Sequence, residues 1–280
     1  MKLNIRDEFS PLKKVIVGRG DFLPEFDVYK TKDPEFLKFV SLKNRWNKKI
    51  LLRQHETFLK ILKKHSVELL FPETDKNLPW QMYTRDIGFV YHDKFFFCHD
   101  RKLKEREGEF DCLSHIFSHV NPKNIIKIDE GKVEAGDVLI DKKQLYIGIS
   151  SRTNTQAVKI IEKHFPVKTL YLGDHVMHLD ARMAILPNKQ LLIYTEAFQE
   201  DDLEYLRKKF EFIPITKKEA VNLGTNVFSI NPETVVVNKA DKRIQKELKA
   251  RGFKIESIDY SESITLAASF RCATLPIERV

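Results

Sequence analysis

Apolar and polar positions follow the same order in four stretches of the chain. These stretches are "RDIGFVYHDKFFFC", "GDVLIDKKQLYIG", "RMAILPNKQLLIY" and "TNVFSINPETVVV", beginning at Arg85, Gly136, Arg182 and Thr225. In each, a polar residue precedes an apolar strand, then a turn rich in Asp, Asn, Pro or Lys, then a second β-rich strand, which is typical of a β-hairpin. The spacing of roughly 45 to 50 residues indicates an internal repeat. One more step along the chain arrives at Cys272.

Helical patterns separate the hairpins. The longest begins near Asp33 and Pro34, which suit a cap and a first helical position, and its apolar face continues to about Lys64. Three further helices are predicted over "NTQAVKIIEKHFP", "EDDLEYLRKKF" and "DKRIQKELKARG", each followed by a short strand. One such unit cannot bury its apolar face alone. We therefore expect an α/β fold of five ββαβ-like units, closed into one pseudo-symmetric domain over residues 1–280, with the polar residue of each leading strand facing a common axis.

The composition is that of an ordinary globular protein, with 42% hydrophobic and 31% charged residues. The N-terminus lacks the apolar segment of a signal peptide, and no run of about 18 apolar residues occurs. Three cysteines, Cys98, Cys112 and Cys272, have no paired spacing, which suits reduced thiols. These features predict a cytoplasmic protein without a membrane partner.

The net charge of +8 and the isoelectric point near 9.2 are compatible with nucleic-acid binding. The lysines, however, are scattered among acidic residues, and no basic run is interleaved with aromatic residues. We therefore expect no nucleic-acid partner, and interpret the positive charge as a solvated surface.

Reactive side chains head the equivalent strands of the repeat. They are Asp86, Glu134, Asp137, His178, Asp180, Asn226 and Cys272. Each has a structural interpretation of its own: a lone cysteine usually packs as a small apolar residue, and carboxylates often occupy hairpin ends. Their coincidence at equivalent places indicates a site on the axis. His175 and His178 form a histidine pair without a matching second pair, so we expect no metal.

Carboxylates next to a thiol raise its pKa and weaken it as a nucleophile at neutral pH. A cationic substrate resolves this conflict. A guanidinium group presents planar pairs of N–H donors that two carboxylates can bind, and its charge favours the thiolate. The residues therefore predict a site for guanidines.

The segments "MYTRDIGFV", "VEAGDVLIDKKQLYIGISSRTN", "HLD" and "FRCATLPI" resemble motifs of the guanidino-group-modifying enzymes, namely arginine deiminases, dimethylarginine dimethylaminohydrolases and amidinotransferases. The resemblance extends along nearly the whole chain. It implies the pentein α/β propeller of five ββαβ units. It also implies roles for six residues: Cys272 as nucleophile, His178 as general acid and base, Glu134 as the partner of that histidine, Asp86 and Asp180 as guanidinium clamps, and Arg152 as the group that holds a substrate carboxylate. We expect Asp137 and Asn226 to contact the substrate as well.

The resemblance implies covalent catalysis in two steps without a metal or organic cofactor. Cys272 adds to the guanidinium carbon, and His178 protonates the departing amine, so that an amidino-cysteine remains. Water activated by His178 then releases a ureido product such as citrulline. An amine acceptor in place of water would instead produce a new guanidine, as in amidinotransferases.

Several motifs bear on the choice between hydrolase and transferase. Glu134 in "EAGD" and the "SSRTN" motif are similar to those of hydrolases, which we favour, whereas "DEFSPLKKVIVGRGDFLP" is more similar to amidinotransferases. "HLD" is similar to deiminases and transferases but not to dimethylarginine hydrolases, which lack that aspartate. Ala267 stands where deiminases carry an arginine, and "TLAASFRC" lacks a glycine-rich run. A further alternative is a non-catalytic propeller similar to a ribosome anti-association factor, but such a binder has no need of Cys272, His178 and three acids.

Overall fold

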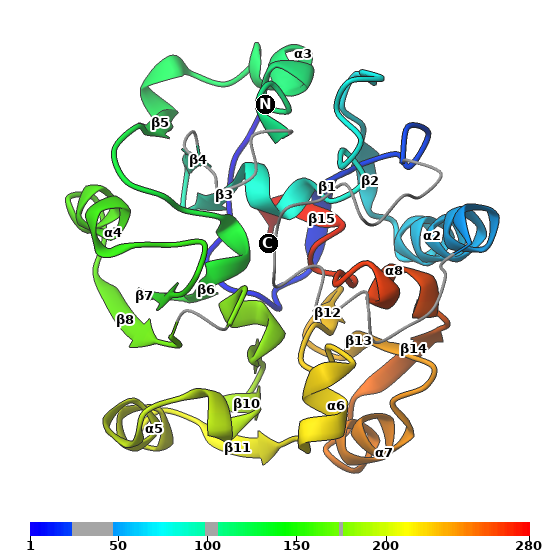
Figure 1. Ribbon diagram of the computed structural model, residues 1–280, viewed down its shortest axis with the longest axis vertical. Helices are drawn as coiled ribbons and strands as arrows, with labels where there is room; N and C mark the ends of the chain where they lie inside the picture. The colour runs from blue at the N-terminus through cyan, green and yellow to red at the C-terminus, as the bar shows by residue number, and fades with distance from the viewer. Residues whose placement is uncertain (24–46, 99–105, 174–175) are drawn as a thin grey trace.

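The computed structural model describes residues 1–23, 47–98, 106–173 and 176–280. Five three-stranded sheets follow one another around a central axis in this part of the chain (Figure 1). Four of them use consecutive strands: β3 (Gly88–Tyr91), β4 (Lys94–Cys98) and β5 (Ile125–Ile128); β6 (Val138–Asp141), β7 (Gln144–Ile149) and β8 (Val167–Tyr171); β9 (Met183–Leu186), β10 (Gln190–Ile193) and β11 (Glu211–Pro214); β12 (Phe228–Ser229), β13 (Thr234–Asn238) and β14 (Lys254–Ile258).

Every sheet has the same pairing. Its first two strands are antiparallel, and the middle strand pairs in parallel with the third. The four hairpins that the sequence predicts are thus confirmed, and the five-unit α/β propeller with them.

The fifth sheet joins segments from opposite ends of the chain. β15 (Thr274–Arg279) pairs antiparallel with β1 (Leu12–Val17), from Leu12 opposite Arg279 to Val17 opposite Thr274. β1 in turn pairs in parallel with β2 (Glu68–Leu70). Figure 1 shows β15 near the centre of the ring. This closure places Cys272, two residues before β15, at the same level as the residues that head the other sheets.

The longer helices lie around the outside of the ring, where each connects the middle strand of a unit to its third strand (Figure 1). They are α2 (Lys48–Lys64), α4 (Thr155–Glu162), α5 (Glu200–Arg207) and α7 (Lys242–Ala250). The three predicted helices of the middle units are confirmed. The predicted start at Asp33 and Pro34 lies outside the described residues; within them α2 is capped by Asn47, whose side chain accepts a hydrogen bond from the Ile50 amide. None of the described helices is both long and apolar enough to cross a membrane.

Three short helices were not predicted, because four or five residues are too few to show a helical period. They are α3 (Ser114–Phe117), α6 (Lys217–Val221) and α8 (Ser261–Thr265). α8 packs against α2 beside the loop that leads to Cys272. In that loop, Phe270 stacks on Tyr260 with ring centroids 4.7 Å apart and contacts Phe58 of α2 at 5.1 Å. The aromatic contacts hold the segment that carries the candidate nucleophile.

A single turn of 3₁₀ helix precedes the leading strand in three units. The turns η2 (Thr84–Ile87), η6 (Ala135–Asp137) and η7 (Leu179–Ala181) lead into β3, β6 and β9. η6 contacts both η2 and η7. Because each turn carries one aspartate, Asp86, Asp137 or Asp180, the repeat brings these three residues together at the axis.

Candidate active site

His178 and Glu134 form the most direct of the expected contacts. His178 Nε2 lies 2.8 Å from Glu134 Oε2 and 3.9 Å from Asp86 Oδ1. Burial opposes a charge on His178, but the charge of Asp86 and the hydrogen bond with Glu134 outweigh burial and raise the pKa of His178. Burial would likewise raise the pKa of Glu134, yet the His178 hydrogen bond and the charge of Arg152 lower it. At neutral pH the pair is therefore an imidazolium and a carboxylate.

The "EAGD" motif fixes the position of His178. A Cβ atom on Gly136 would lie 2.5 Å from His178 Nδ1, so that no larger residue fits beneath the imidazole ring. Asp137 is fully buried; its Oδ1 accepts from the Leu179 amide at 2.9 Å and its Oδ2 from the Ser150 hydroxyl at 2.6 Å. Burial raises the pKa of Asp137 to about 7. These contacts favour a positioning role for Asp137; the predicted substrate contact stays a prediction.

Asp86 already binds a guanidinium group of the chain itself. Its Oδ2 accepts from Arg106 Nη1 at 2.8 Å, and its Oδ1 accepts from the Gly136 amide at 3.3 Å. Arg106 also donates through Nε to both oxygens of Glu109, at 3.1 and 3.0 Å, and through Nη2 to the Tyr83 carbonyl. Arg106 is thus held between two carboxylates.

Arg152 contacts Glu134, with 3.4 Å between its Nη1 and Glu134 Oε1. The side chain is buried, and its backbone amide donates to the Ser150 hydroxyl at 3.0 Å. In this arrangement Arg152 stabilises the carboxylate that faces His178. Its role toward a substrate carboxylate stays a prediction.

Cys272 faces the axis from the loop before β15. Its sulfur lies 3.8 Å from Asn226 Oδ1, which also accepts from the Arg271 amide at 2.9 Å. Asn226 Nδ2 donates to the Asp180 carbonyl at 3.5 Å, so this side chain connects the two loops. Burial, followed by the charges of Asp180 and Asp86, raises the pKa of Cys272. The free thiol is therefore protonated at neutral pH, as the sequence predicts.

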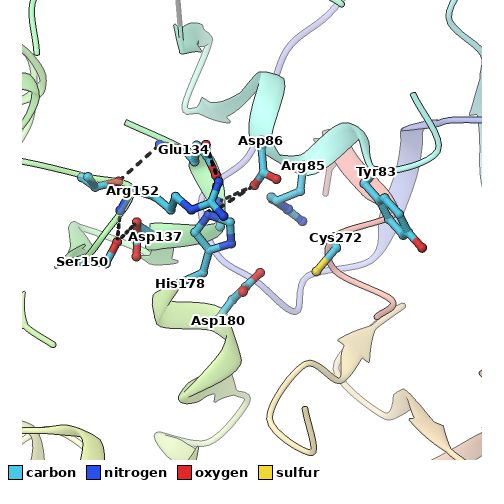
Figure 2. A network of polar contacts seen from close by, with 12 residues as sticks. Tyr83, Arg85, Asp86, Glu134, Asp137, Ser150, Arg152, His178, Asp180 and Cys272 are labelled. Atoms are coloured by element: carbon cyan, nitrogen blue, oxygen red, sulfur yellow. Dashed lines mark hydrogen bonds and ion pairs between the residues drawn. The ribbon is translucent and has the colours of Figure 1, made fainter. Parts of the chain in front are cut away.

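Asp180 combines an ion pair with an unused acceptor. Its Oδ2 accepts from Arg271 Nε at 3.3 Å, whereas its Oδ1 is buried and accepts no hydrogen bond from the described residues. Arg271 also binds Glu8 through Nη1 and the Val138 carbonyl through Nη2 at 3.2 Å. Burial raises the pKa of Asp180 in spite of the Arg271 charge. In Figure 2, Asp180 lies between His178 and Cys272.

The sequence interpretation included Arg152 but did not assign Arg85, Arg106, Arg271 or Glu8 to this site. Asp86, Glu134 and Asp180 are each paired with an arginine, Arg106, Arg152 or Arg271. The chain itself thus supplies cations to these three acids, and Asp180 and Asp86 still raise the pKa of Cys272, as expected. The available signals were the arginines in "TRD" and "FRC", next to residues that were chosen, and the quoted segment "DEFSPLKKVIVGRGDFLP", which contains Glu8. No pattern marks Arg106.

Asp86, Glu134 and His178 also bring ligand atoms within 4.8 Å of one another, a geometry that a metal ion could use. Arg106 and Arg152 already supply positive charge to the two carboxylates, and the His178 nitrogen closest to them is hydrogen-bonded to Glu134. His175 lies outside the described residues. The expectation of a metal-free site stays a prediction.

The sequence model of the family described as "N,N dimethylarginine dimethylhydrolase, eukaryotic" matches residues 25–279. The chain belongs to this family. The dimethylarginine hydrolase family lies within the guanidino-group-modifying enzymes, so the resemblance drawn from the sequence motifs is confirmed.

Individual relatives of this family member are similar over most of its length. The uncharacterized protein YkgA of Bacillus subtilis is 32% identical over 279 residues, which cover 98% of this chain and 94% of the relative. The N(G),N(G)-dimethylarginine dimethylaminohydrolase of Mycobacterium tuberculosis is 31% identical over 229 residues, 80% of this chain and 73% of the relative.

Solved structures share the fold. The N-terminal domain of ArgZ, solved with a covalently bound reaction intermediate, superposes with a TM-score of 0.82 at 20% identity, over 95% of this chain and 98% of that domain. The Pseudomonas aeruginosa dimethylarginine hydrolase, solved as a Cys-to-Ser mutant with citrulline, gives a TM-score of 0.79 at 21% identity, over 95% and 99%. These likenesses confirm the pentein fold for this member of the family.

Proposed function

We propose that the protein is a cysteine-dependent hydrolase that acts on arginine or an arginine-like guanidine through an amidino-cysteine intermediate. The observation that carries the proposal is the buried Asp180 Oδ1, which has no donor among the described residues. A buried carboxylate oxygen without a donor is costly, and a bound N–H group removes that cost. Asp180 lies between His178 and Cys272 in Figure 2, so a guanidinium bound to it would lie beside the proposed nucleophile.

The reaction begins when a substrate guanidinium binds between Asp86 and Asp180. Its positive charge lowers the pKa of Cys272, and the thiol proton leaves to solvent. The sulfur then adds to the guanidinium carbon. Imidazolium His178 gives a proton to the departing amine, so the C–N bond breaks and the amidino-cysteine remains. Neutral His178 next takes a proton from water, whose oxygen bonds to the same carbon; the C–S bond then breaks, Cys272 leaves as thiolate, and the ureido product is released.

The Asp180 carboxylate favours an unmethylated guanidine. In the proposed pose the departing nitrogen faces Asp180; dimethylation of that nitrogen removes its N–H donors and would leave Oδ1 buried and unsatisfied, which costs about 1–3 kcal/mol. We therefore expect arginine to be preferred over N,N-dimethylarginine, even though the matching family is described by the methylated substrate. This expectation agrees with the "HLD" motif, which resembles deiminases.

Amidino transfer is the second candidate. The segment "DEFSPLKKVIVGRGDFLP" resembles amidinotransferases, and its Glu8 contacts Arg271 directly before Cys272. The L-arginine:L-lysine amidinotransferase of Pseudomonas savastanoi is 24% identical over 165 residues, which cover 54% of this chain and 45% of the relative. We favour hydrolysis because Glu134, rather than an aspartate, contacts His178.

A panel of guanidines tests both candidates. Arginine, N,N-dimethylarginine and agmatine, which lacks the carboxylate, are each incubated with and without lysine or glycine, and the products are identified by mass. We expect citrulline and ammonia from arginine without any amine, and no turnover by Cys272→Ser. A new guanidine formed only when an amine is present would favour transfer, and absence of turnover throughout would contradict both.

A further inference from the structure

Arg85 is attached to the loop of the nucleophile by two hydrogen bonds. Its backbone amide donates to the Cys272 carbonyl at 3.0 Å, and its Nε donates to the Arg271 carbonyl at 3.3 Å. The residue is only 4% exposed. In Figure 2 its guanidinium lies between Asp86 and Cys272. The position of this cation is therefore fixed relative to the sulfur.

Arg85 differs from its neighbouring arginines. Arg106, Arg152 and Arg271 each form an ion pair with a carboxylate, whereas Arg85 forms none with the residues that the structure describes. Its Nη2 is buried and has no hydrogen-bond partner there. Burying such a donor costs free energy, because no acceptor replaces the water that it loses.

The charges around Arg85 leave it cationic at neutral pH. Burial and the charge of Arg271 lower its pKa to about 10, against the charges of Glu8 and Asp180. The group that can gain a negative charge beside it is the sulfur of Cys272, which also feels Asp180 and Asp86.

The other titratable groups that interact with the sulfur carry no positive charge that could take the place of Arg85. Tyr83 and Tyr260 are buried and interact with Cys272, and burial raises the pKa of both, so they stay neutral. Asp180 and Asp86 disfavour a negative sulfur, whereas Arg85 favours it.

We propose that Arg85 is a positioning residue whose fixed positive charge stabilises the thiolate of Cys272 while the S–H proton is lost to solvent. The inference rests on the proposed role of Cys272 as nucleophile. The charge of Arg85 acts before and during attack on the guanidinium carbon, in addition to the charge that the substrate brings. It forms no bond to the substrate.

A purely structural role for Arg85 would depend on its hydrogen bond to the Arg271 carbonyl. Two substitutions separate the roles. Arg85→Lys keeps the positive charge and loses the guanidinium geometry, whereas Arg85→Met loses the charge and keeps an unbranched apolar stem. Arg53→Met, on the exposed face of α2, is the matched control for loss of one positive charge.

The experiment follows alkylation of Cys272 by chloroacetamide, a neutral reagent, between pH 6.5 and 9, and locates the modified residue by mass spectrometry. We expect Arg85→Met to react about tenfold more slowly at each pH, since one pKa unit is a tenfold change in thiolate. Arg85→Lys should stay within about threefold of the unaltered protein, and Arg53→Met should match it. If Arg85→Met does not fold, Arg85→Gln, which keeps an N–H donor, takes its place with the same expectation.

An unchanged alkylation profile in the folded neutral variant would overturn the proposal, as would equal losses in the Lys and Met variants, which would indicate a structural role. The measurement needs no substrate. A slowed profile without any guanidine turnover would therefore contradict the proposed function alone, and turnover with an unchanged profile would contradict the role of Arg85 alone.

Discussion

The two halves of the candidate site differ in how their polar atoms are used. In the acid–base half, formed by His178, Glu134 and Asp137, both oxygens of each carboxylate accept hydrogen bonds. In the nucleophile half, formed by Cys272, Asp180 and Arg85, one carboxylate oxygen and one guanidinium nitrogen are buried without partners among the described residues. Protein groups thus satisfy the carboxylates of the first half, and the proposed function assigns the unpaired atoms of the second half to a substrate guanidinium and to the ionised thiol.

Substitution of Cys272 or His178 should have the largest effect on kcat. We expect Cys272→Ser and His178→Ala each to lower kcat by about 10³-fold or more, because nucleophile and acid–base group act as one unit. Steady-state assays with the best guanidine of the panel measure this loss. Cys112→Ser is the control, since its half-buried thiol lies elsewhere; loss of activity in that variant would mean that the wrong thiol was assigned.

Asp180→Asn should have the next largest effect and should act on selectivity. The substitution keeps the shape but removes a charged acceptor, so we expect kcat/KM for arginine to fall by about 10-fold to 100-fold. The preference over N,N-dimethylarginine should shrink at the same time, because a dimethylated departing nitrogen has no N–H to donate to this oxygen. A uniform loss for both substrates would contradict the proposed clamp.

Glu134→Gln should change the pH dependence of kcat. Glu134 raises the pKa of His178, and the leaving amine needs the protonated imidazole. Activity therefore falls as the pH rises through the His178 pKa, and without the carboxylate this fall should begin about one pH unit lower. The pH profile of kcat measures the shift, and an unmoved alkaline limb would remove Glu134 from the control of His178.

Asp137→Asn should have the smallest effect on activity and a clear effect on stability. The folded protein keeps the Asp137 proton up to about pH 7, whereas the unfolded chain releases it near 3.8. The folded state therefore binds more protons between these values, and the free energy of unfolding falls as the pH rises, by about 1.4 kcal/mol per pKa unit. Asparagine resembles the protonated form, so denaturant unfolding of the variant between pH 4 and 7 should lose this slope. An unaltered slope would assign it to other groups.

The predictability of the fold depended on how local each signal is. The hairpins at Arg85, Gly136, Arg182 and Thr225 could be predicted because a turn and its two strands lie within about 15 residues. The repeat also predicted Cys272 as the residue that precedes the leading strand of the fifth unit. The pairing of β15 with β1 could not be predicted, because periodicity within one segment carries no information about a distant partner.

In the site, too, only residues marked by a local signal could be predicted. Glu134, His178 and Cys272 could be found because the repeat marks their positions, whereas the direction of Arg85 and Arg271 depends on a 3₁₀ turn and a loop that a single sequence does not specify. Arg106 and Glu8 reach the site from segments outside the repeat positions, so only tertiary structure assigns their contacts.

The closing sheet has a consequence for how the protein is made. β1 is synthesised early, yet its antiparallel partner β15 is synthesised after all the other strands, and contacts between such distant segments slow folding. On the ribosome, β1 cannot pair with Thr274–Arg279, and the ring cannot close, until that segment has emerged. The same event orders the loop that carries Cys272, because Arg85 and Asn226 hold that loop from other units. A nascent chain therefore closes the ring and orders the Cys272 loop in the same event.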